Sequence, residues 1–510
     1  MKLKPRPRYL ASLLLALALL LGLCFLGAPG AKADSPAVWD GSIDTSWYTA
    51  DPGAGSFVIT TPAQLKGLSY LVNANQAEWL ALGLSTADPN YSETKRFVGT
   101  TITLGADIYL NATTGTEPGD TTQREWIPIG GGLDNSGVDP GALHSWGGTF
   151  DGAGHTVHNF YLDRPEGGRD GSRNLGFIGL VAHGGLVKNL TVTGFINADR
   201  SIGGVVGKNW GTIENCVNYA TVTGHESKGV GGIVGANWFD LTYQITVPPV
   251  VRGCLNYGTV TTYYPTGLAG GITGDNEGVV ERCGNYGTIR AGVTGTANVG
   301  GITGNIKNKP AYADGEAVRD CFNAGTIEGG QWTAGVVAQV QEGEAIILNC
   351  CNLGTVTGGG NLDYAGGILG KNQGGTVAIT NCYNTGTITA VDNAGAIAGL
   401  ILAGSTTTNL YYLEGSAPVA FATGDGVGTA TATDETEADM KDPAFALQVS
   451  GLGRAFVPAT DNYPVLRWQT TDTSTLTGLT ITTPPTKTDY LAGESFDPAG
   501  MVVSASYSDG

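Results

Sequence analysis

The chain has 510 residues, of which 81 are glycine, 41% are hydrophobic and 14% are charged. Glycine is about twice as frequent as in an average globular protein and charge about half as frequent, while the hydrophobic fraction is too high for a disordered polymer and no Gly-X-Y period of collagen occurs. The formal net charge of −18 argues against nucleic acid and anionic membranes as partners, because both need clustered lysine and arginine. This composition favours a secreted all-β protein.

Residues 1–33 have the features of a secretory signal peptide. Basic residues within the first eight positions precede an apolar run over 10–26, and Ala31-Lys32-Ala33 offers small residues at the positions that a signal peptidase inspects. We expect cleavage after Ala33, an extracellular location and no membrane insertion of the mature chain. The alternative is an uncleaved membrane anchor, since the apolar run approaches the length of a membrane span.

Residues 34–145 are expected to cap the start of the fold. The segment over 57–60 predicts a strand. Thr61 and Pro62 then predict the start of an amphipathic helix, with Thr61 as N-cap. The apolar face of this helix would consist of Leu65, Leu68, Leu71 and Val72.

Two phrases recur in phase along the next part of the chain, which is the signature of a repeat protein. The first is Gly-apolar-x-Gly or a close variant, and it begins at residues 176, 204, 232, 271, 301, 335, 367 and 396. The second is Cys-x-Asn-x-(Gly/Ala)-Thr-(Val/Ile), and it begins at Cys216, Cys254, Cys283, Cys321, Cys350 and Cys382.

Each repeat contains short β-branched stretches bounded by glycine or asparagine, which predict strands and turns. A period near 30 residues with about three strands is typical of one coil of a parallel β-helix. We therefore predict an all-β fold whose main part is a right-handed parallel β-helix over 146–410, with short capping helices. The alternative is a β-propeller, whose blades need ~40 or more residues and four strands each.

The repeated asparagines predict ladders along the axis, because asparagine tolerates left-handed turns and its amides can hydrogen-bond from coil to coil. One expected column contains Asn218, Asn256, Asn285, Asn323, Asn352 and Asn384. A second contains Asn209, Asn237, Asn276, Asn305 and Asn372. Both columns are assigned a structural role and no catalytic one.

The six cysteines of the second phrase share one coil position, with Cys351 beside the fifth of them. We expect a column of buried, small hydrophobic side chains. The alternative is a set of disulfides between coils, since neighbouring coils approach the Cα separation of a disulfide. No Cys-x-x-Cys pair occurs, so the sequence predicts no metal site.

Three segments follow the repeats. Residues 411–469 are expected to form a C-terminal cap with one acidic helix over 433–449 and a strand over 463–468. Residues 470–475 have the composition of a linker. Residues 476–510 predict the first half of a small β-sandwich, which is truncated here.

Several of these motifs resemble a known group of bacterial surface proteins. FDGAGHTV (150–157), GFIGLVAHGGLVKNLTVTG (176–194) and the repeated phrases are similar to GLUG-motif repeats. WDGSIDTSWY and YPVLRW are similar to segments that flank such repeats in Gram-positive gut anaerobes, and residues 476–510 resemble a bacterial Ig-like domain of group 3. The resemblance implies an extracellular or wall-attached protein with adhesive or structural roles. Cell-wall attachment would depend on sequence beyond residue 510.

The acidic residues form no pattern that suggests catalysis. Polysaccharide lyases and glycoside hydrolases need converging carboxylates. The carboxylates of the repeats are instead scattered, without a paired arrangement, at Glu214, Asp275, Glu281, Asp320 and Asp363. We therefore predict no catalytic residue, no metal and no cofactor, with a carbohydrate-active β-helix enzyme as the alternative.

Aromatic residues are the candidates for ligand binding. Trp210 and Trp238 follow the second asparagine column on successive coils, and Tyr219, Tyr257 and Tyr286 form another column. Exposed aromatic rings suit sugars, and a solenoid face suits extended ligands. We predict an exported cell-surface structural or adhesion protein whose partners are glycans or host proteins. The alternative for the tryptophans is that they cover a loop or the long 233–268 insertion.

Overall fold

The computed structural model describes residues 36–92, 94–131, 144–165, 173–225, 229–239, 247–307, 316–360, 363–427, 429–451, 455–470, 476–489 and 499–507. The predicted signal peptide and most of the predicted linker lie outside the described residues. The chain divides into Met1–Ala37 and Val38–Gly510, and the second of these units contains all the strands and helices described below.

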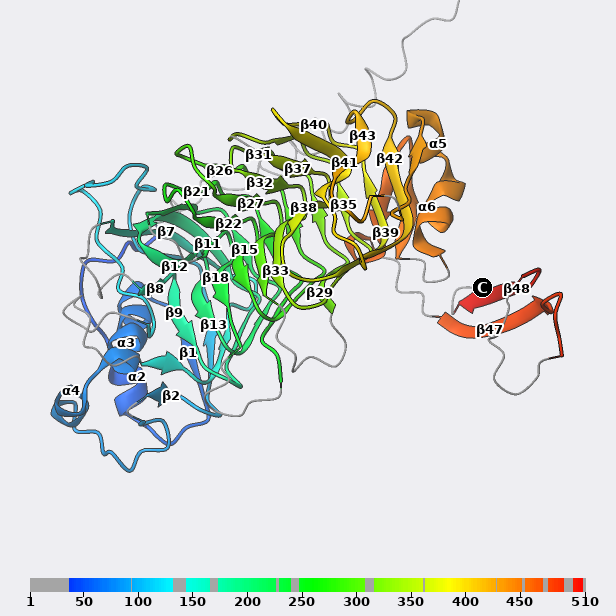
Figure 1. Ribbon diagram of the computed structural model, residues 1–510. Helices are drawn as coiled ribbons and strands as arrows, with labels where there is room; N and C mark the ends of the chain where they lie inside the picture. The colour runs from blue at the N-terminus through cyan, green and yellow to red at the C-terminus, as the bar shows by residue number, and fades with distance from the viewer. Residues whose placement is uncertain are drawn as a thin grey trace, which may run out of the picture. The chain divides into compact units, whose positions relative to one another are not determined.

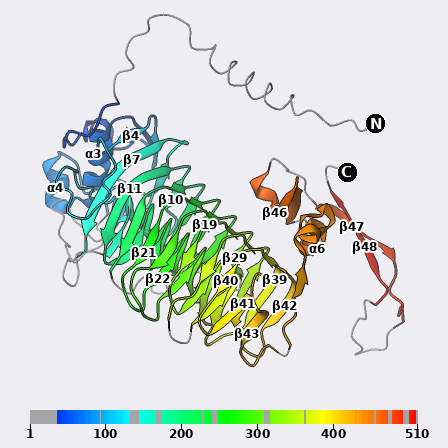
Figure 2. The ribbon, with the colours of Figure 1, turned by 90° about the horizontal axis from the view of Figure 1, so that it is seen from above.

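The second unit contains a parallel β-helix, which confirms the predicted fold class (Figure 1). Its strands form a 26-stranded sheet, here called sheet A, and an 18-stranded sheet, called sheet B. Equivalent strands of successive coils pair in parallel, for example over Thr212–Glu214 with Val250–Arg252. Figure 2 shows the coils following one another in chain order.

A full coil contains five short strands, where the sequence predicted about three. One such coil consists of β14 (Thr212–Glu214), β15 (Val217–Asn218), β16 (Thr221–Gly224), β17 (Val230–Gly231) and β18 (Val234–Asn237). One division arises just before the cysteine in five repeats, where a residue with positive φ separates two strands of sheet A. These residues are Asn215, Gly253, Arg282, Asp320 and Asn349, whereas strand β39 (Val377–Asn384) continues through Asn381 despite its positive φ.

Sheet A has three strand positions per coil. The first holds β1 (Ser56–Ile59), β3 (Thr101–Leu104), β6 (Thr149–Asp151), β10 (Leu186–Lys188), β14, β19 (Val250–Arg252), β24 (Val279–Glu281), β29 (Glu316–Arg319) and β34 (Ala345–Leu348). The second holds β4 (Ile108–Tyr109), β15, β20 (Leu255–Asn256), β25 (Gly284–Asn285), β30 (Phe322–Asn323) and β35 (Cys351–Asn352). The third holds β16, β21 (Val260–Thr262), β26 (Ile289–Ala291), β31 (Ile327–Glu328), β36 (Val356–Thr357) and β40 (Ile388–Thr389). Longer strands span two positions, and these are β7 (Thr156–Arg164), β11 (Thr191–Ala198), β39 (Val377–Asn384) and β42 (Thr406–Leu413).

Sheet B has two strand positions per coil. The first holds β8 (Arg173–Leu175), β12 (Arg200–Gly203), β17, β22 (Leu268–Gly270), β27 (Asn298–Gly300), β32 (Trp332–Ala334) and β37 (Tyr364–Gly366). The second holds β2 (Lys95–Arg96), β5 (Ser145–Trp146), β9 (Ile178–Val181), β13 (Val206–Asn209), β18, β23 (Thr273–Asn276), β28 (Thr303–Lys307), β33 (Val337–Glu342) and β38 (Leu369–Asn372). The last coils are completed by β41 (Asn393–Leu400), β43 (Val419–Thr423) and, in sheet A, β44 (Thr433–Glu435).

The coil stack therefore extends on both sides of 146–410. At the start, β1 pairs with β3 and β3 pairs with β6, so strands within the predicted capping region already belong to sheet A. At the end, β41 pairs with β43 and β42 pairs with β44. Columns of inward-facing isoleucine and valine, together with the single column of six repeated cysteines, fill one continuous core.

The N-terminal helix has the predicted start and the predicted buried face. Helix α3 (Pro62–Asn73) begins with a capping box between Thr61 and Gln64. All four leucine and valine residues of its predicted apolar face are fully buried and join the core of the solenoid. The shorter helices α2 (Ser46–Thr49) and α4 (Gln76–Ala81) precede and follow it.

Lys66 on α3 is buried without a carboxylate partner among the described residues. It is 6% exposed, its ammonium group lies 5.5 Å from the Trp126 ring centroid, and its hydrogen-bond partner is the Ser69 hydroxyl at 3.4 Å. Burial lowers the pKa of Lys66 to about 8. The charged amine therefore opposes folding at neutral pH.

We expect Lys66→Met to raise the free energy of unfolding at pH 7 by about 2 kcal/mol. The variant no longer buries a charged amine, and the free energy regained in this way exceeds the energy of the lost cation–π contact. Between pH 8 and the unfolded value of 10.5, the folded protein releases this proton before the unfolded chain does. Wild-type stability should therefore rise with pH across that window, relative to the variant. Urea unfolding at pH 7 and pH 10 measures both effects, and a constant difference between the two proteins would contradict this assignment.

The C-terminal segment differs from its prediction in two respects. The single helix predicted over 433–449 is wrong, because the segment forms β44, α5 (Glu437–Lys441) and α6 (Pro443–Ser450). Proline disfavours a helical conformation in the residue before it, so Asp442 is extended and caps α6 instead. The hairpin of β45 (Phe456–Ala459) and β46 (Asn462–Leu466) follows, and it ends in the short 3-10 helix η4 (Arg467–Gln469).

This segment packs on the outer face of sheet A as well as following its last coil. Phe322, Cys351, Tyr383 and Tyr411 form one outward-facing register column of sheet A. Met440, Phe445, Val449, Phe456 and Leu466 pack against that column in a second hydrophobic cluster. Beyond it, β47 (Leu476–Thr483) and β48 (Val502–Tyr507) form an antiparallel pair, and the Ig-like assignment stays a prediction. Within the described ranges no helix is long and apolar enough to cross a membrane.

Candidate ligand-binding face

The first asparagine column forms a continuous hydrogen-bonded ladder inside the solenoid. Each Nδ2 donates to the Oδ1 of the next asparagine, with distances of 2.9 Å from Asn218 to Asn256 and 2.7 Å from Asn285 to Asn323. Each side chain also donates to the carbonyl oxygen two positions later, and the first four also accept from the N–H of that residue, as Asn285 does with Gly287. The ladder runs to Asn384 through fully buried side chains. Its amides are occupied by the fold and are not available to a ligand.

The second asparagine column is shorter than predicted. Asn209, Asn237 and Asn276 are in register and hydrogen-bond in sequence, at 2.9 and 2.7 Å. The expectation for Asn305 is wrong, because it lies in register with Asp275, one position away. Ile306 and Val340 occupy the column between Asn276 and Asn372. A one-residue shift within a strand moves a side chain to the other face of the sheet.

The repeated cysteines lie in one buried column, and the seven described cysteines are all unpaired thiols. Each sulfur of the repeat lies near the carbonyl oxygen two residues earlier, as in the 3.3 Å contact from Cys254 to Arg252. Burial raises the pKa of the Cys216, Cys254, Cys283, Cys321 and Cys350 thiols well above the usual value. Such thiols are poor nucleophiles, so this column fits a packing role.

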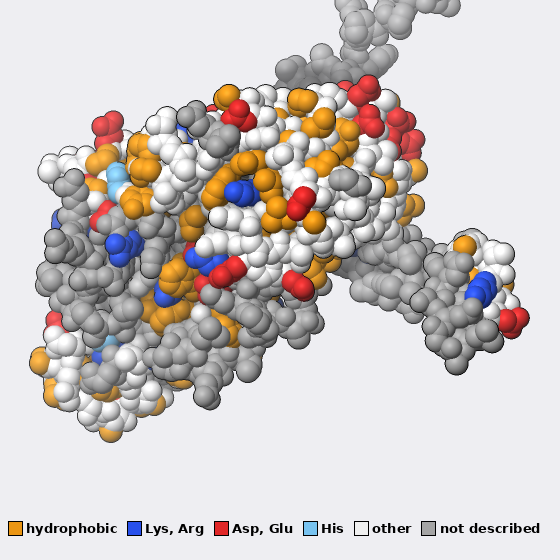
Figure 3. All heavy atoms as spheres, viewed as in Figure 1, with side chains coloured by type: hydrophobic (Ala, Val, Ile, Leu, Met, Phe, Trp, Pro, Cys, Tyr) orange, Lys and Arg blue, Asp and Glu red, His pale blue; other side chains and the backbone are white. Residues whose placement is uncertain are grey.

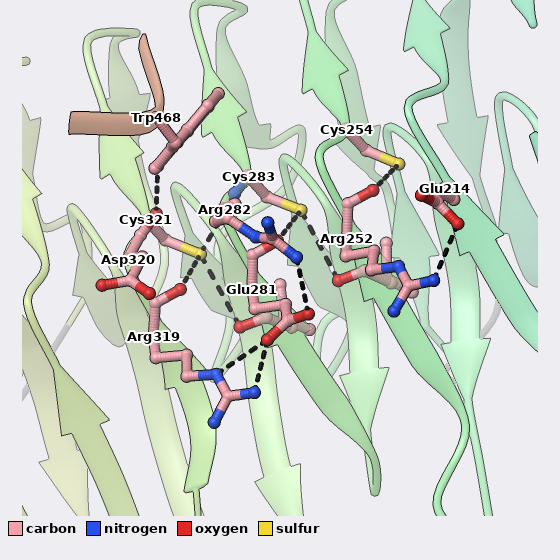
Figure 4. A network of polar contacts seen from close by, with 12 residues as sticks. Glu214, Arg252, Cys254, Glu281, Arg282, Cys283, Arg319, Asp320, Cys321 and Trp468 are labelled. Atoms are coloured by element: carbon pink, nitrogen blue, oxygen red, sulfur yellow. Dashed lines mark hydrogen bonds and ion pairs between the residues drawn. The ribbon is translucent and has the colours of Figure 1, made fainter. Parts of the chain in front are cut away.

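A charge ladder runs along the first strand position of sheet A, and four of its members lie two positions before a cysteine (Figure 4). Its register column alternates in sign through Asp151, Lys188, Glu214, Arg252, Glu281 and Arg319. Arg252 pairs with Glu214 at 2.8 Å, and Lys188 pairs with Asp151 at 3.1 Å. The interpretation of Glu214 and Glu281 as scattered carboxylates is therefore wrong. The charge that alternates in sign two places before Cys216, Cys254, Cys283 and Cys321 was the signal that could have revealed most of the ladder.

Glu281 is the most buried carboxylate of this ladder. Burial by itself would raise its pKa, but the Arg319 guanidinium, bonded at 2.8 Å, and then Arg282 hold the pKa below its usual value. Neighbouring Asp320 has a raised pKa because it is buried. The ladder is thus a set of satisfied ion pairs, which favours correct register between coils.

The two predicted tryptophans are closed off by a lysine. The Lys208 ammonium group lies 4.7 Å from the Trp210 ring centroid and 4.4 Å from that of Trp238. Both indoles are half-buried, and Trp238 Nε1 donates to the Asp275 carboxylate at 2.9 Å. That carboxylate also pairs with Lys307 at 3.1 Å. These contacts use the indole faces that the sequence had assigned to a ligand.

The three predicted tyrosines stack face to face along the axis. Ring centroids are 4.8 Å apart from Tyr219 to Tyr257 and 4.7 Å apart from Tyr257 to Tyr286, with planes within 10° of parallel. Their side chains are 53%, 39% and 43% exposed. Because each ring covers the next, the stack presents ring edges and hydroxyl groups where the sequence suggested open ring faces.

The tyrosine stack continues into the C-terminal segment. Tyr286 contacts Phe322 edge to face at 5.2 Å, and Phe322 contacts Trp468 at 5.9 Å. Trp468 Nε1 donates to the Asp320 carbonyl at 2.8 Å, beside the charge ladder (Figure 4). The tryptophans lie after the sheet B strands β13 and β18 and the tyrosines after β15, β20 and β25, so the fold does not bring these two groups together.

The fold and this surface define a β-helix protein with an exposed aromatic stack. No protein-family model matches the chain. A stretch of 83 residues, 16% of this chain, is 34% identical to a halomucin from Haloquadratum walsbyi and covers 1% of that protein. A crystal structure from Bacteroides ovatus, of a protein proposed to be an immunoglobulin A1 protease, is similar with a TM-score of 0.39 and 18% identity. That similarity covers 81% of this chain and 92% of the other.

Proposed function

We propose that this chain is an exported surface protein whose β-helix supports a ligand-binding tyrosine stack and performs no catalysis. Its ligands would be extended molecules, either glycans or host proteins. The observation that carries this proposal is the exposure of three parallel tyrosines on successive coils. Tyrosine combines a rigid apolar ring with a hydroxyl group, and it is enriched where proteins bind partners.

The repeat spacing supports an extended ligand. Tyr219, Tyr257 and Tyr286 present equivalent edges every 4.7 to 4.8 Å along the axis. A ligand that runs along the solenoid can meet each edge in turn, with apolar contact to the ring and a hydrogen bond to the hydroxyl. The partial similarity to a halomucin supports a surface location, and the predicted signal peptide supports export.

Replacing all three tyrosines by alanine should weaken binding to the glycan or host-protein ligand at least tenfold. Truncation of an aromatic side chain that anchors a ligand commonly costs about 1 kcal/mol or more of binding free energy. The measurement is a glycan and protein array followed by titration of the strongest ligand. Tyr263→Ala is the matched control, because Tyr263 is 42% exposed but stacks on His225 outside this group. Equal loss in the control, or release of reducing ends or unsaturated products, would contradict the proposal.

A further inference from the structure

A second group of polar and aromatic residues lies on sheet B, and it is independent of the tyrosine stack. Trp332 lies in register between Asn298 and Tyr364, and Gln339 lies in register between Asn305 and Lys371. Asn298 Nδ2 donates to Gln339 Oε1, which joins the two strand positions. We call these six residues the sheet B cluster. Over this part of the molecule, Figure 3 shows Lys or Arg side chains ringed by hydrophobic ones.

The sheet B cluster contains buried polar atoms that the fold leaves unsatisfied. Asn298 is 2% exposed and Asn305 is fully buried, yet the Oδ1 atom of each has no hydrogen-bond partner among the described residues. The Trp332 indole nitrogen is also buried and has no partner there. An unsatisfied buried group costs roughly 1–3 kcal/mol, so folded proteins seldom retain several of them together. The cluster therefore contains two acceptors and one donor that have no partner among the described residues.

A cation completes the cluster. The Lys371 ammonium group lies 4.4 Å from the Trp332 ring centroid and 5.4 Å from the Tyr364 ring centroid. It forms no ion pair with any described carboxylate, whereas Lys307 nearby is paired with Asp275. Burial lowers the pKa of Lys371. An anionic partner would offset that loss of hydration.

We propose that the sheet B cluster binds a sugar residue that carries a carboxylate, such as a uronic acid within a polysaccharide. The sugar hydroxyls donate to Asn298 and Asn305, a ring or hydroxyl oxygen accepts from Trp332, and the carboxylate pairs with Lys371. An inorganic anion lacks the hydroxyl donors, and a neutral sugar lacks the group that pairs with the ammonium ion.

Isothermal titration calorimetry of the purified protein with tetragalacturonic acid tests this proposal. We expect binding that weakens at least tenfold for the fully methyl-esterified tetramer, which keeps the rings but loses the charges. Lys371→Met should weaken binding of the acid at least tenfold and leave the ester unaffected. Lys441→Met is the matched control, because it removes the same charge from exposed helix α5. Acylation footprinting should show that the acid protects Lys371 and leaves Lys441 reactive.

Four results would overturn the proposal. The first is equal binding of the acid and its ester, and the second is equal loss in Lys371→Met and Lys441→Met. The third is no protection of Lys371 at saturating acid, which would leave water as the occupant of the cluster. Loss of acid binding in the tyrosine triple variant, with Lys371→Met unaffected, would place the acid on the tyrosine stack. That outcome refutes the sheet B site and leaves the proposed function intact.

Discussion

Replacing Asn285 by alanine should lower the free energy of unfolding by about 3–5 kcal/mol. The Asn285 amide donates to Asn323 at 2.7 Å and accepts from Asn256 at 2.8 Å, and it also bonds both backbone groups of Gly287. All of these partners lie in the interior, and each buried polar group that loses its hydrogen-bond partner destabilises the fold by roughly 1–3 kcal/mol. Because several groups lose a partner together, the expected loss exceeds that of an average substitution.

Urea unfolding followed by circular dichroism measures this loss. Hydrogen exchange should accompany it, because solenoids can open locally around one weakened coil. We expect faster exchange in the coils that contain Asn256, Asn285 and Asn323. Asn462→Ala is the matched control, since among the described residues its exposed side chain bonds only the backbone of Tyr463, and the substitution should cost about 0.5 kcal/mol or less. Equal losses in the two variants would refute the ladder as a source of stability.

Gly271→Ala is expected to destabilise the protein by about 3 kcal/mol or more. A Cβ atom at this position would lie 2.2 Å from the Gly301 carbonyl oxygen and 2.5 Å from Asn285 Cγ. Overpacking a core commonly costs 1–3 kcal/mol, and here the obstacle is backbone held in register by the neighbouring coil. The added methyl group can be accommodated only if the coils separate.

Gly55→Ala is the control for this substitution, because a Cβ atom there would meet nothing within 4 Å. We expect the free energy of unfolding of that variant to lie within about 0.5 kcal/mol of the wild-type value. Thermal unfolding of both variants checks the difference. If Gly271→Ala unfolds like Gly55→Ala, the close contact between the coils at Gly271 is incorrect.

The same contact explains why two phrases recur in phase along the sequence. The first glycine of a Gly-apolar-x-Gly phrase lies against the ladder asparagine of the same repeat. Added Cβ atoms would lie within 2.2 to 2.6 Å of these amides at Gly204, Gly232, Gly271, Gly301, Gly335 and Gly367. A larger residue in the first phrase would displace the asparagine of the second, so the phrases depend on each other through direct contact.

Several charged and aromatic features could not be predicted at the level of single contacts. The sequence placed Tyr219, Tyr257 and Tyr286 in one column, but whether rings show faces or edges depends on the direction of each side chain. It placed Trp210 and Trp238 in a column too, but Lys208 lies over both rings because of the local side-chain packing. Asn305 was misplaced although the sequence itself separates it from this column. It is the fifth residue counted from Gly301, whereas the other members are each the sixth residue of their phrase.

The sequence by itself determined the parallel β-helix and its first asparagine column, because stacked coils bring equivalent positions together and select the same residue at each. Only the tertiary structure decided which side chains remain available to a ligand. Exposure depends on neighbours that are distant in sequence, as where the segment containing Phe445 covers the column from Phe322 to Tyr411. The unpartnered atoms of Asn298, Asn305 and Trp332 likewise emerge only when two strand positions of sheet B meet. A short repeat can encode its own stacking, whereas a binding surface depends on the departures from that repeat.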